Sequence, residues 1–298
     1  MTKRFIAIDL GSNAVRLTVA GLLPSGELVR ESSYRVPLRL GDDVFSTGLI
    51  SEETEKRMTS VFLAFRYLIQ FFEPIAYRAC ATSAMREALN GVSVAEDIFK
   101  RTGVRLEIIS GKEEAQFLFV NREDLLAKKG SSLLYIDVGG GSTEVSYIVR
   151  GIPLKSDSFR IGAVRSLKGK VTPAEQNRLA VFLSEVPANS ETRVICTGGN
   201  IEKLKELCDS NEKNRNFSCK ELKEILDKLN KLSVEERIKE FCLKPDRADV
   251  IVPAGKIYYS ILKKLDLKEF QVPKMGVSDG ILRSLAEKHK NATEPRFV

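Results

Sequence analysis

The chain has 298 residues, a formal net charge of +7, five cysteines and a single histidine, His289. No stretch reaches the ~18 uninterrupted apolar residues of a membrane span, and no leader sequence is evident, so we expect a cytoplasmic protein with free thiols. Because the histidine lies in a polar C-terminal stretch, the composition argues against hydrolytic triads that need an imidazole. Catalysis is expected to use carboxylates, backbone amides, cations and a metal ion.

The positive charge is unevenly spread along the chain. Residues 1–150 contain 19 basic and 19 acidic side chains, so the whole excess lies in residues 151–298. A polyanionic ligand, a nucleic acid or an anionic surface would each suit this half, as would an ordinary solvated surface. Aromatic residues make up 7% of the chain and tryptophan is absent, which argues against an RNA-binding platform.

Strands and helices are predicted to alternate along the chain, which indicates an α/β protein. In the first half, strands are expected over residues 5–40, 76–81 and 106–109, and helices over residues 51–72, 82–90 and 110–128. In the second half, hydrophobic periodicity predicts a hairpin around Asp137, a strand over residues 194–196 and a series of helices. These helices are expected over residues 200–207, 221–232, 235–243, 248–265 and 278–289, with a polar loop over 209–218.

One sequence pattern occurs twice: an apolar strand that ends in Asp, a glycine turn with a hydroxyl residue, and a second strand. The first copy runs over residues 5–13 with its second strand over 15–20, and the second copy runs over residues 133–144 with its second strand over 145–149. Each is predicted to be a β-hairpin whose tip exposes backbone N–H groups that can bind an anion. A single turn of this kind is usually only a tight turn. Two copies favour a phosphate clamp and indicate two related domains with a cleft between them.

The glutamate pair Glu113 and Glu114 lies at the start of a predicted helix. Ser110 and Glu113 match the capping box, so Glu113 is expected to bond back to the helix start. Glu114 lies about 100° further round the helix and is free to point elsewhere. A solvated first-turn carboxylate is the ordinary alternative, but the position directly before the second hairpin favours Glu114 as a general base.

The second glycine turn carries the candidate metal and phosphate ligands. Asp137 and Glu144 flank it, and Asp9 holds the equivalent place at the first turn. Hard oxygen ligands combined with phosphate oxygens are typical of a Mg²⁺ site. The glycines leave no side chain between the backbone amides and a phosphate. The predicted phosphate ligands of this turn are Gly139, Gly140, Gly141, Ser142 and Thr143.

Further phosphate contacts are predicted from three other places. Ser12 and Asn13 occupy the tip of the first hairpin. Arg86 is placed in the first turn of its predicted helix, where a cation opposes the helix dipole unless an anion is near; a surface salt bridge is the alternative. Gly199 and Asn200 open a helix after a strand and could bind a phosphate or a ribose.

Together these residues resemble the exopolyphosphatase/guanosine pentaphosphate phosphatase (Ppx/GppA) family of the actin-like ATPase superfamily. The matching stretches follow one another in the family's order and are residues 7–17, 81–90, 109–115, 137–144, 162–165, 249–253 and 278–280. The chain departs from the family pattern at Asn200, where Gly-Gly-Thr is usual, and in a short segment between Arg165 and Arg193.

The resemblance implies two actin-like (ribonuclease H-like) α/β domains with an interdomain cleft. Domain I would cover residues 1–118 together with a C-terminal helix at about 287–298, and domain II would cover residues 119–286. The division places the Glu114 motif in the first domain and the second glycine turn in the second domain.

The resemblance also implies an activity, namely Mg²⁺-dependent hydrolysis of a terminal phosphoanhydride in inorganic polyphosphate or pppGpp. Glu114 would be the catalytic base, and Asp137 and Glu144 would lie near the metal. Residues 139–143, with Asn13 and Arg86, would contact phosphate.

Two other functions remain open at the level of the sequence. A kinase of the same superfamily would share the fold, because fold alone does not set the reaction. A non-catalytic sensor could bind polyphosphate or pppGpp through the basic half. The sequence ranks neither substrate above the other, and it leaves a homodimer open.

Overall fold

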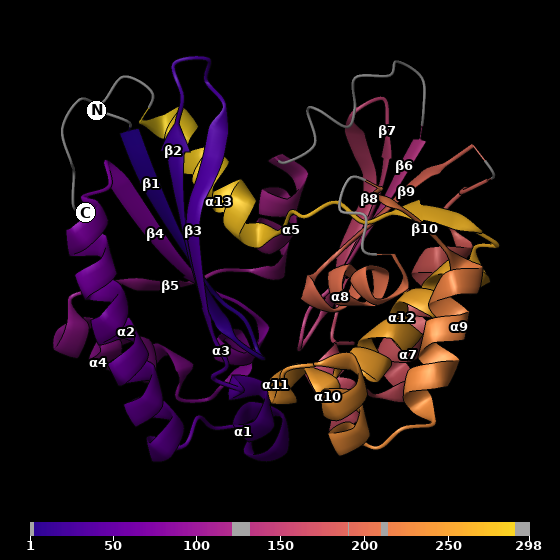
Figure 1. Cartoon of the computed structure of the whole chain (residues 1–298), viewed down its shortest axis with the longest axis horizontal. Coiled ribbons are helices and arrows are strands. Elements are labelled where there is room, and N and C mark those ends of the chain that lie inside the picture. Colours follow the sequence, from indigo (N-terminus) through magenta and orange to yellow (C-terminus); the bar gives the residue numbers. More distant parts are fainter. Residues whose placement is uncertain (1–2, 121–131, 190, 210–213, 290–298) are drawn as a thin grey trace. The chain divides into compact units, whose positions relative to one another are not determined.

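The computed structural model describes residues 3–120, 132–189, 191–209 and 214–289. The chain divides into two compact units, which are described separately. Unit 1 comprises residues 1–122 and 276–298, and unit 2 comprises residues 123–275 (Figure 1).

Unit 1 is built on a five-stranded sheet of order β3-β2-β1-β4-β5. β1, β2 and β3 form an antiparallel meander, and β4 and β5 continue the sheet in parallel on the other side of β1. Residues 5–8 of β1 are all buried, as expected for a central strand covered on both faces. The strands are β1 (Lys3–Leu10), β2 (Val15–Leu22), β3 (Leu28–Val36), β4 (Ala76–Ala81) and β5 (Leu106–Ile108).

The helices of unit 1 cover this sheet. α13 packs on β1, β2 and β4 and also on α5, while α2 packs against α4 (Figure 1). Ser51 caps α2 as its sequence predicts, because the Ser51 side chain accepts a hydrogen bond from the Thr54 N–H. The helices are α1 (Leu40–Thr47), α2 (Glu52–Phe72), α3 (Ser83–Glu87), α4 (Gly91–Thr102), α5 (Gly111–Val120) and α13 (Val277–Lys288).

Unit 2 is built on a six-stranded sheet of order β10-β11-β9-β6-β7-β8. β6, β7 and β8 form an antiparallel meander, and β9 pairs in parallel with the other side of β6. This arrangement repeats the one that β1, β2, β3 and β4 make in unit 1. The strands are β6 (Ser132–Val138), β7 (Thr143–Val149), β8 (Ile152–Phe159), β9 (Arg193–Thr197), β10 (Asn216–Ser218) and β11 (Glu269–Gln271).

The helices of unit 2 gather around α12, which packs on α6, α8, α9 and β6. They are α6 (Ala163–Leu167), α7 (Pro173–Ser184), α8 (Gly199–Cys208), α9 (Cys219–Asn230), α10 (Val234–Phe241), α11 (Pro245–Ala248) and α12 (Ile251–Lys264). The α/β class predicted from the sequence is confirmed. Among the described helices, none is long and apolar enough to cross a membrane.

Several observed elements differ from the predicted ones, and the helices α4, α6 and α7 and the strands β8, β10 and β11 were not predicted. The end of the strand region predicted over 5–40 is followed by a helix, α1, that the sequence analysis missed. The helix predicted over 82–90 stops at Glu87, because the Asn90 side chain bonds to both the N–H (2.9 Å) and the C=O (2.8 Å) of Ile50. The helix predicted over 248–265 begins later, at Ile251 of α12, so that Pro253, which has no N–H, lies in the first turn where it is tolerated.

The C-terminal part of the chain also differs from the expected division. The predicted second domain includes residues 276–286, whereas α13 packs on β1 and α5 and these residues belong to unit 1. The helix expected at about 287–298 falls largely outside the described residues, as does the predicted extension of the α5 helix beyond residue 120.

Candidate functional site

A row of four polar residues crosses one face of the sheet in unit 2. Thr197 on β9 pairs with Asp137 on β6, Asp137 pairs with Glu144 on β7, and Glu144 pairs with Ser158 on β8. Directly paired residues project from the same face, with Cβ atoms about 4.5–5.5 Å apart in an antiparallel pair. The strand register therefore sets the two carboxylates predicted from the sequence side by side, and a hydroxyl flanks each of them.

The two hydroxyls hold the two carboxylates. The Thr197 hydroxyl donates to Asp137 Oδ1, and the Ser158 hydroxyl donates to Glu144 Oε1 at 2.7 Å. Asp137 is 9% exposed and Glu144 is 1% exposed. Burial raises the pKa of Asp137 above its usual value, and the hydrogen bond from Thr197 opposes that shift. Two adjacent buried carboxylates are costly to ionise unless a cation neutralises them.

This pair of carboxylates fits a divalent cation of the Mg²⁺ type. Among the described residues, the hydrogen bond to the Asp137 carboxylate goes to Oδ1, which leaves Oδ2 as a free hard-oxygen ligand. Mg²⁺ keeps several waters and is usually bound through one or two carboxylates together with substrate phosphates. Within the described chain, no three His, Cys, Asp or Glu side chains gather into a metal-binding group. Water and phosphate would thus supply most of the ligands.

The glycine turn after Asp137 is held from one side by the start of α6. The C=O of Gly139 accepts from Ala163 N (3.0 Å). The C=O of Gly140 accepts from Val164 N (2.8 Å) and from Arg165 N (3.1 Å). Arg165 Nε donates to the C=O of Gly141 at 2.8 Å. In a trans peptide the following N–H points away from the C=O. The N–H groups of residues 140–142 are therefore directed away from α6, as an anion-binding turn requires.

Gly162 makes this close approach possible, and Gly162→Ala is expected to disrupt it. A Cβ built at Gly162 would lie 2.5 Å from the carbonyl carbon of Gly140 and still closer to that of Gly141. Backbone cannot yield as a side chain does, so we expect a loss of about 1–3 kcal/mol in the free energy of unfolding. Urea denaturation measures this loss, and phosphate binding should weaken with it. Leu167→Ala, which shortens a side chain of α6 that is 41% exposed, is the control. Equal stability of Gly162→Ala and the wild type would contradict the close approach.

Gly199 and Asn200 lie at the start of α8, directly after the end of β9. A Cβ built at Gly199 would lie 3.0 Å from Arg247 Nη2, so a guanidinium borders this helix N-terminus. Asn200 is half-buried. The roles of Gly199 and Asn200 in phosphate binding stay predictions. The Thr143 hydroxyl, also a predicted phosphate ligand, donates to the C=O of Ile161 and is fully buried.

In unit 1 the structure brings Glu114 and Arg86 together. Arg86 donates to Glu114 Oε2 through Nη1 (3.3 Å) and Nη2 (3.4 Å), and Nη1 also donates to the C=O of Ile109 at 2.7 Å. Glu114 is 7% exposed. The sequence argument that placed Arg86 in a first helical turn is wrong, because α3 is a single turn and Arg86 lies near its end. The carboxylate of Glu114, rather than a helix dipole, fixes this guanidinium.

Glu113 and Glu114 point in different directions, as the helical spacing predicts. Only half of the predicted capping box forms: Glu113 N–H donates to Ser110 Oγ at 3.1 Å, but its carboxylate accepts from Arg78 Nη2 at 2.8 Å instead of bonding back. The Glu113 side chain is 35% exposed and that of Glu114 is 9% exposed. Of these two adjacent glutamates, Glu113 therefore pairs with an arginine near the surface, and Glu114 is buried.

The first glycine turn has the same construction as the second. The C=O of Ser12 accepts from Gly41 N (2.8 Å), and the C=O of Asn13 accepts from Arg39 N (2.9 Å), both at the start of α1. The same peptide geometry directs the N–H groups of residues 13 and 14 away from α1. Among the described residues, the buried Ser12 hydroxyl oxygen has no hydrogen-bond partner. Asp9 is half-buried at the end of β1, and its role as a metal ligand stays a prediction.

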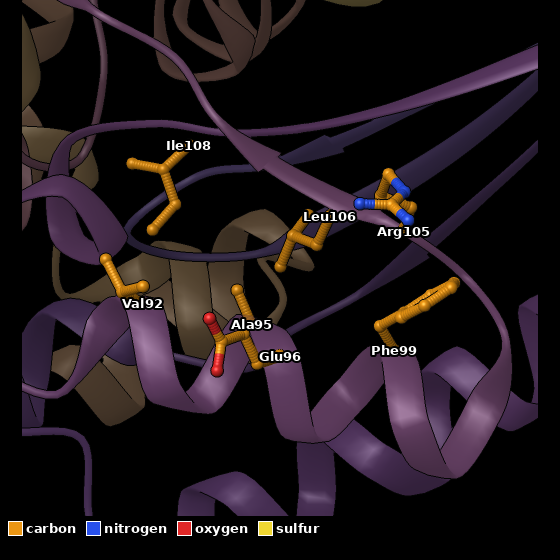
Figure 2. Close-up of a pocket in the computed structure, with 7 residues that line it drawn as sticks. All are labelled: Val92, Ala95, Glu96, Phe99, Arg105, Leu106 and Ile108. Carbon is orange, nitrogen blue, oxygen red and sulfur yellow. The ribbon is translucent and has the colours of Figure 1, made fainter.

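A separate pocket of unit 1 contains none of the predicted site residues. It has a volume of about 280 Å³, lies between α4 and β5, and is lined mainly by apolar side chains (Figure 2). The guanidinium of Arg105 lies over the ring of Phe99 at 4.5 Å. Because the lining is mainly apolar and the guanidinium stacks on a ring, this pocket does not suit a phosphate.

The fold and these turns together define the class of protein. Two units share one strand arrangement, and each places a helix-supported glycine turn after a strand with Asp as its penultimate residue, which is the architecture of the actin-like ATPase fold. The chain belongs to the Ppx/GppA phosphatase family, whose model matches residues 28–289. This membership confirms the resemblance drawn from the sequence and places the chain among the phosphatases.

Individual relatives agree with this assignment. The chain is 26% identical to exopolyphosphatase 2 of Mycobacterium tuberculosis over 315 residues, which cover 95% of this chain and 98% of that protein. It is 24% identical to exopolyphosphatase 1 of the same organism over 303 residues, covering 95% and 88% of the two chains. The crystal structure of the Aquifex aeolicus Ppx/GppA family member is similar with a TM-score of 0.77 and 25% identity, covering 98% of this chain and 100% of that one.

Three residues that shape the site received no role in the sequence analysis: Gly162, Arg165 and Thr197. The first two lie in the Gly-Ala-Val-Arg stretch that carries part of the family resemblance, so a signal was present. Thr197 directly precedes the Gly198-Gly199 pair, but its bond to Asp137 depends on the pairing of β6 with β9.

Proposed function

We propose that this phosphatase is a Mg²⁺-dependent exopolyphosphatase that releases the terminal phosphate of inorganic polyphosphate, of pppGpp, or of both, by attack of water on a phosphoanhydride. The observation that carries the proposal is the glycine turn of unit 2, whose N–H groups face away from α6 beside two paired carboxylates. The names of the mycobacterial relatives support the polyphosphate substrate.

Unit 1 supplies the base and a phosphate-binding cation in this proposal. Glu114 accepts the proton of the attacking water, and the guanidinium of Arg86 orients Glu114 and neutralises charge on a phosphate oxygen. The N–H of Asn13, turned away from α1, and the Ser12 hydroxyl are the further phosphate donors of this unit. The leaving group is itself a phosphate chain, so no histidine acid is needed.

Unit 2 supplies the metal ligands and the main phosphate cradle. Asp137 Oδ2 and Glu144 would hold Mg²⁺, with Asp9 as the third predicted ligand, and the bound ion would neutralise charge on phosphate oxygens. The N–H groups of residues 140–142 would bind the terminal phosphate. Gly199 and Asn200 would contact a more distant phosphate or a ribose.

A phosphate-release assay tests the proposed function. Short and long polyphosphate, pppGpp and ATP are each incubated with the protein and Mg²⁺, with no other acceptor, and with a chelator in the control. We expect phosphate release from polyphosphate or pppGpp that stops when the metal is chelated. Strict dependence on an added acceptor would show a kinase instead. Binding of polyphosphate without any release of phosphate would show a sensor.

A further inference from the structure

A chain of buried hydroxyl groups ends at the Asp137 carboxylate. Tyr135 Oη and Thr197 Oγ1 are 2.7 Å apart, and Thr197 Oγ1 donates to Asp137 Oδ1. Thr197 has a single hydroxyl proton and gives it to Asp137, so Tyr135 must be the donor in the other bond. Tyr135 is 1% exposed and Thr197 is fully buried. The chain of donors therefore has one direction, towards the carboxylate.

A second tyrosine fixes the backbone on both sides of this contact. Tyr258 of α12 is fully buried, its hydroxyl donates to the C=O of Thr197, and it accepts from the N–H of Val138 at 3.0 Å. One hydroxyl thus joins the last residue of β9 to the residue after Asp137 in β6. Gly198 has φ +116°, and a Cβ there would lie 2.9 Å from Tyr258 Oη, so only glycine fits beside this hydroxyl.

We infer that Thr197, held in place by Tyr258 and Tyr135, is a positioning residue that orients the Asp137 carboxylate so that Oδ2 faces the Mg²⁺ site of the proposed function. The inference rests on that proposed function. A carboxylate with one oxygen fixed by a hydroxyl cannot rotate freely about its Cβ–Cγ bond. Hydrogen bonds of this kind to metal ligands typically change metal affinity or activity by about 10–100-fold when they are removed.

The test compares Thr197→Val with Thr197→Ser. Valine keeps the shape of threonine and removes its hydroxyl, whereas serine restores the hydroxyl. Mn²⁺ binding is measured by water-proton relaxation in the absence of substrate, with Mn²⁺ as the probe metal. We expect Thr197→Val to weaken Mn²⁺ binding by about 10–100-fold, and Thr197→Ser to recover most of that loss. The Mg²⁺ concentration needed for half-maximal phosphate release should rise in Thr197→Val and return towards the wild-type value in Thr197→Ser.

Ser146→Ala is the matched control, because Ser146 lies on β7, is buried, and bonds to the Ser156 hydroxyl rather than to a carboxylate. We expect its Mn²⁺ affinity to equal that of the wild type. If Thr197→Val does not fold in a urea titration, Tyr135→Phe takes its place, since it removes the donor to Thr197 and should weaken Mn²⁺ binding to a smaller extent.

The outcomes separate this inference from the proposed function. Wild-type affinity for Mn²⁺ in Thr197→Val, or in Tyr135→Phe where the first variant is unfolded, would overturn the positioning role and leave the exopolyphosphatase proposal intact. A wild-type protein that neither binds Mn²⁺ nor responds to Mg²⁺ would overturn the metal-dependent function, and the inference with it. If Thr197→Ser bound Mn²⁺ as weakly as Thr197→Val, packing and not the hydroxyl would account for the loss, and the positioning role would be overturned.

Discussion

Replacing Glu114 by Gln is expected to lower kcat for phosphate release by about 10²–10⁴-fold, the usual contribution of a general base. The amide cannot accept the proton of the attacking water, yet it has nearly the size of the carboxylate. Since Arg86 also donates to the C=O of Ile109, its guanidinium should stay in place and continue to bind phosphate. KM for polyphosphate should therefore change little. Steady-state phosphate release with Mg²⁺ gives both constants.

Glu113→Gln is the control for this variant, because it makes the same chemical change one residue earlier on the same helix. The Glu113 carboxylate pairs with Arg78 near the surface, and such pairs contribute about 0–1 kcal/mol to stability. We expect Glu113→Gln to keep wild-type activity. Equal activity of Glu114→Gln and Glu113→Gln would remove Glu114 from the reaction and require another base.

Local sequence patterns predicted the parts of the fold that depend on local chemistry. The alternation of strands and helices, the Ser51 cap of α2 and the two hairpins that follow Asp9 and Asp137 all form as expected. A contact between distant residues accounts for one of the errors. The helix expected to continue to Asn90 stops at Glu87, because the Asn90 amide bonds to the backbone of Ile50, which is 40 residues away.

In the candidate site too, local motifs could be recognised in the sequence, whereas contacts between distant residues could not. The candidate residues Glu114, Asp137 and Glu144 could be picked from motif and spacing, and their roles stay predictions. The pairing of Glu114 with Arg86 joins residues that are 28 positions apart, and the bond from Thr197 to Asp137 joins residues that are 60 apart. Strand register brings Thr197 beside Asp137, and the fold of unit 1 brings Arg86 of α3 to Glu114 of α5. A single sequence carries no direct record of either.

The position of α5, which carries Glu114, depends on its contact with α13, so Gly280→Ala is expected to be the most damaging single methyl addition in unit 1. A Cβ built at Gly280 would lie 2.5 Å from the carbonyl carbon of Phe117 and 2.7 Å from its Cα. Phe117 follows Glu114 by one helical turn. Overpacking against backbone costs about 1–3 kcal/mol of unfolding free energy, and urea denaturation measures that cost.

The displacement of α5 in Gly280→Ala should also lower the rate of phosphate release. Arg86 and Glu114 are joined at 3.3 and 3.4 Å, so a small outward shift of α5 would break the pair. Misplacing a catalytic group by about 1 Å can lower the rate by about 10²-fold, and we expect kcat of the folded Gly280→Ala protein to fall by that order. Gly276→Ala is the control, since its added Cβ meets no atom within 4 Å and its extended backbone accepts any residue. A Gly280→Ala protein as stable and as active as Gly276→Ala would mean that α5 is positioned by other contacts and that Glu114 does not depend on α13.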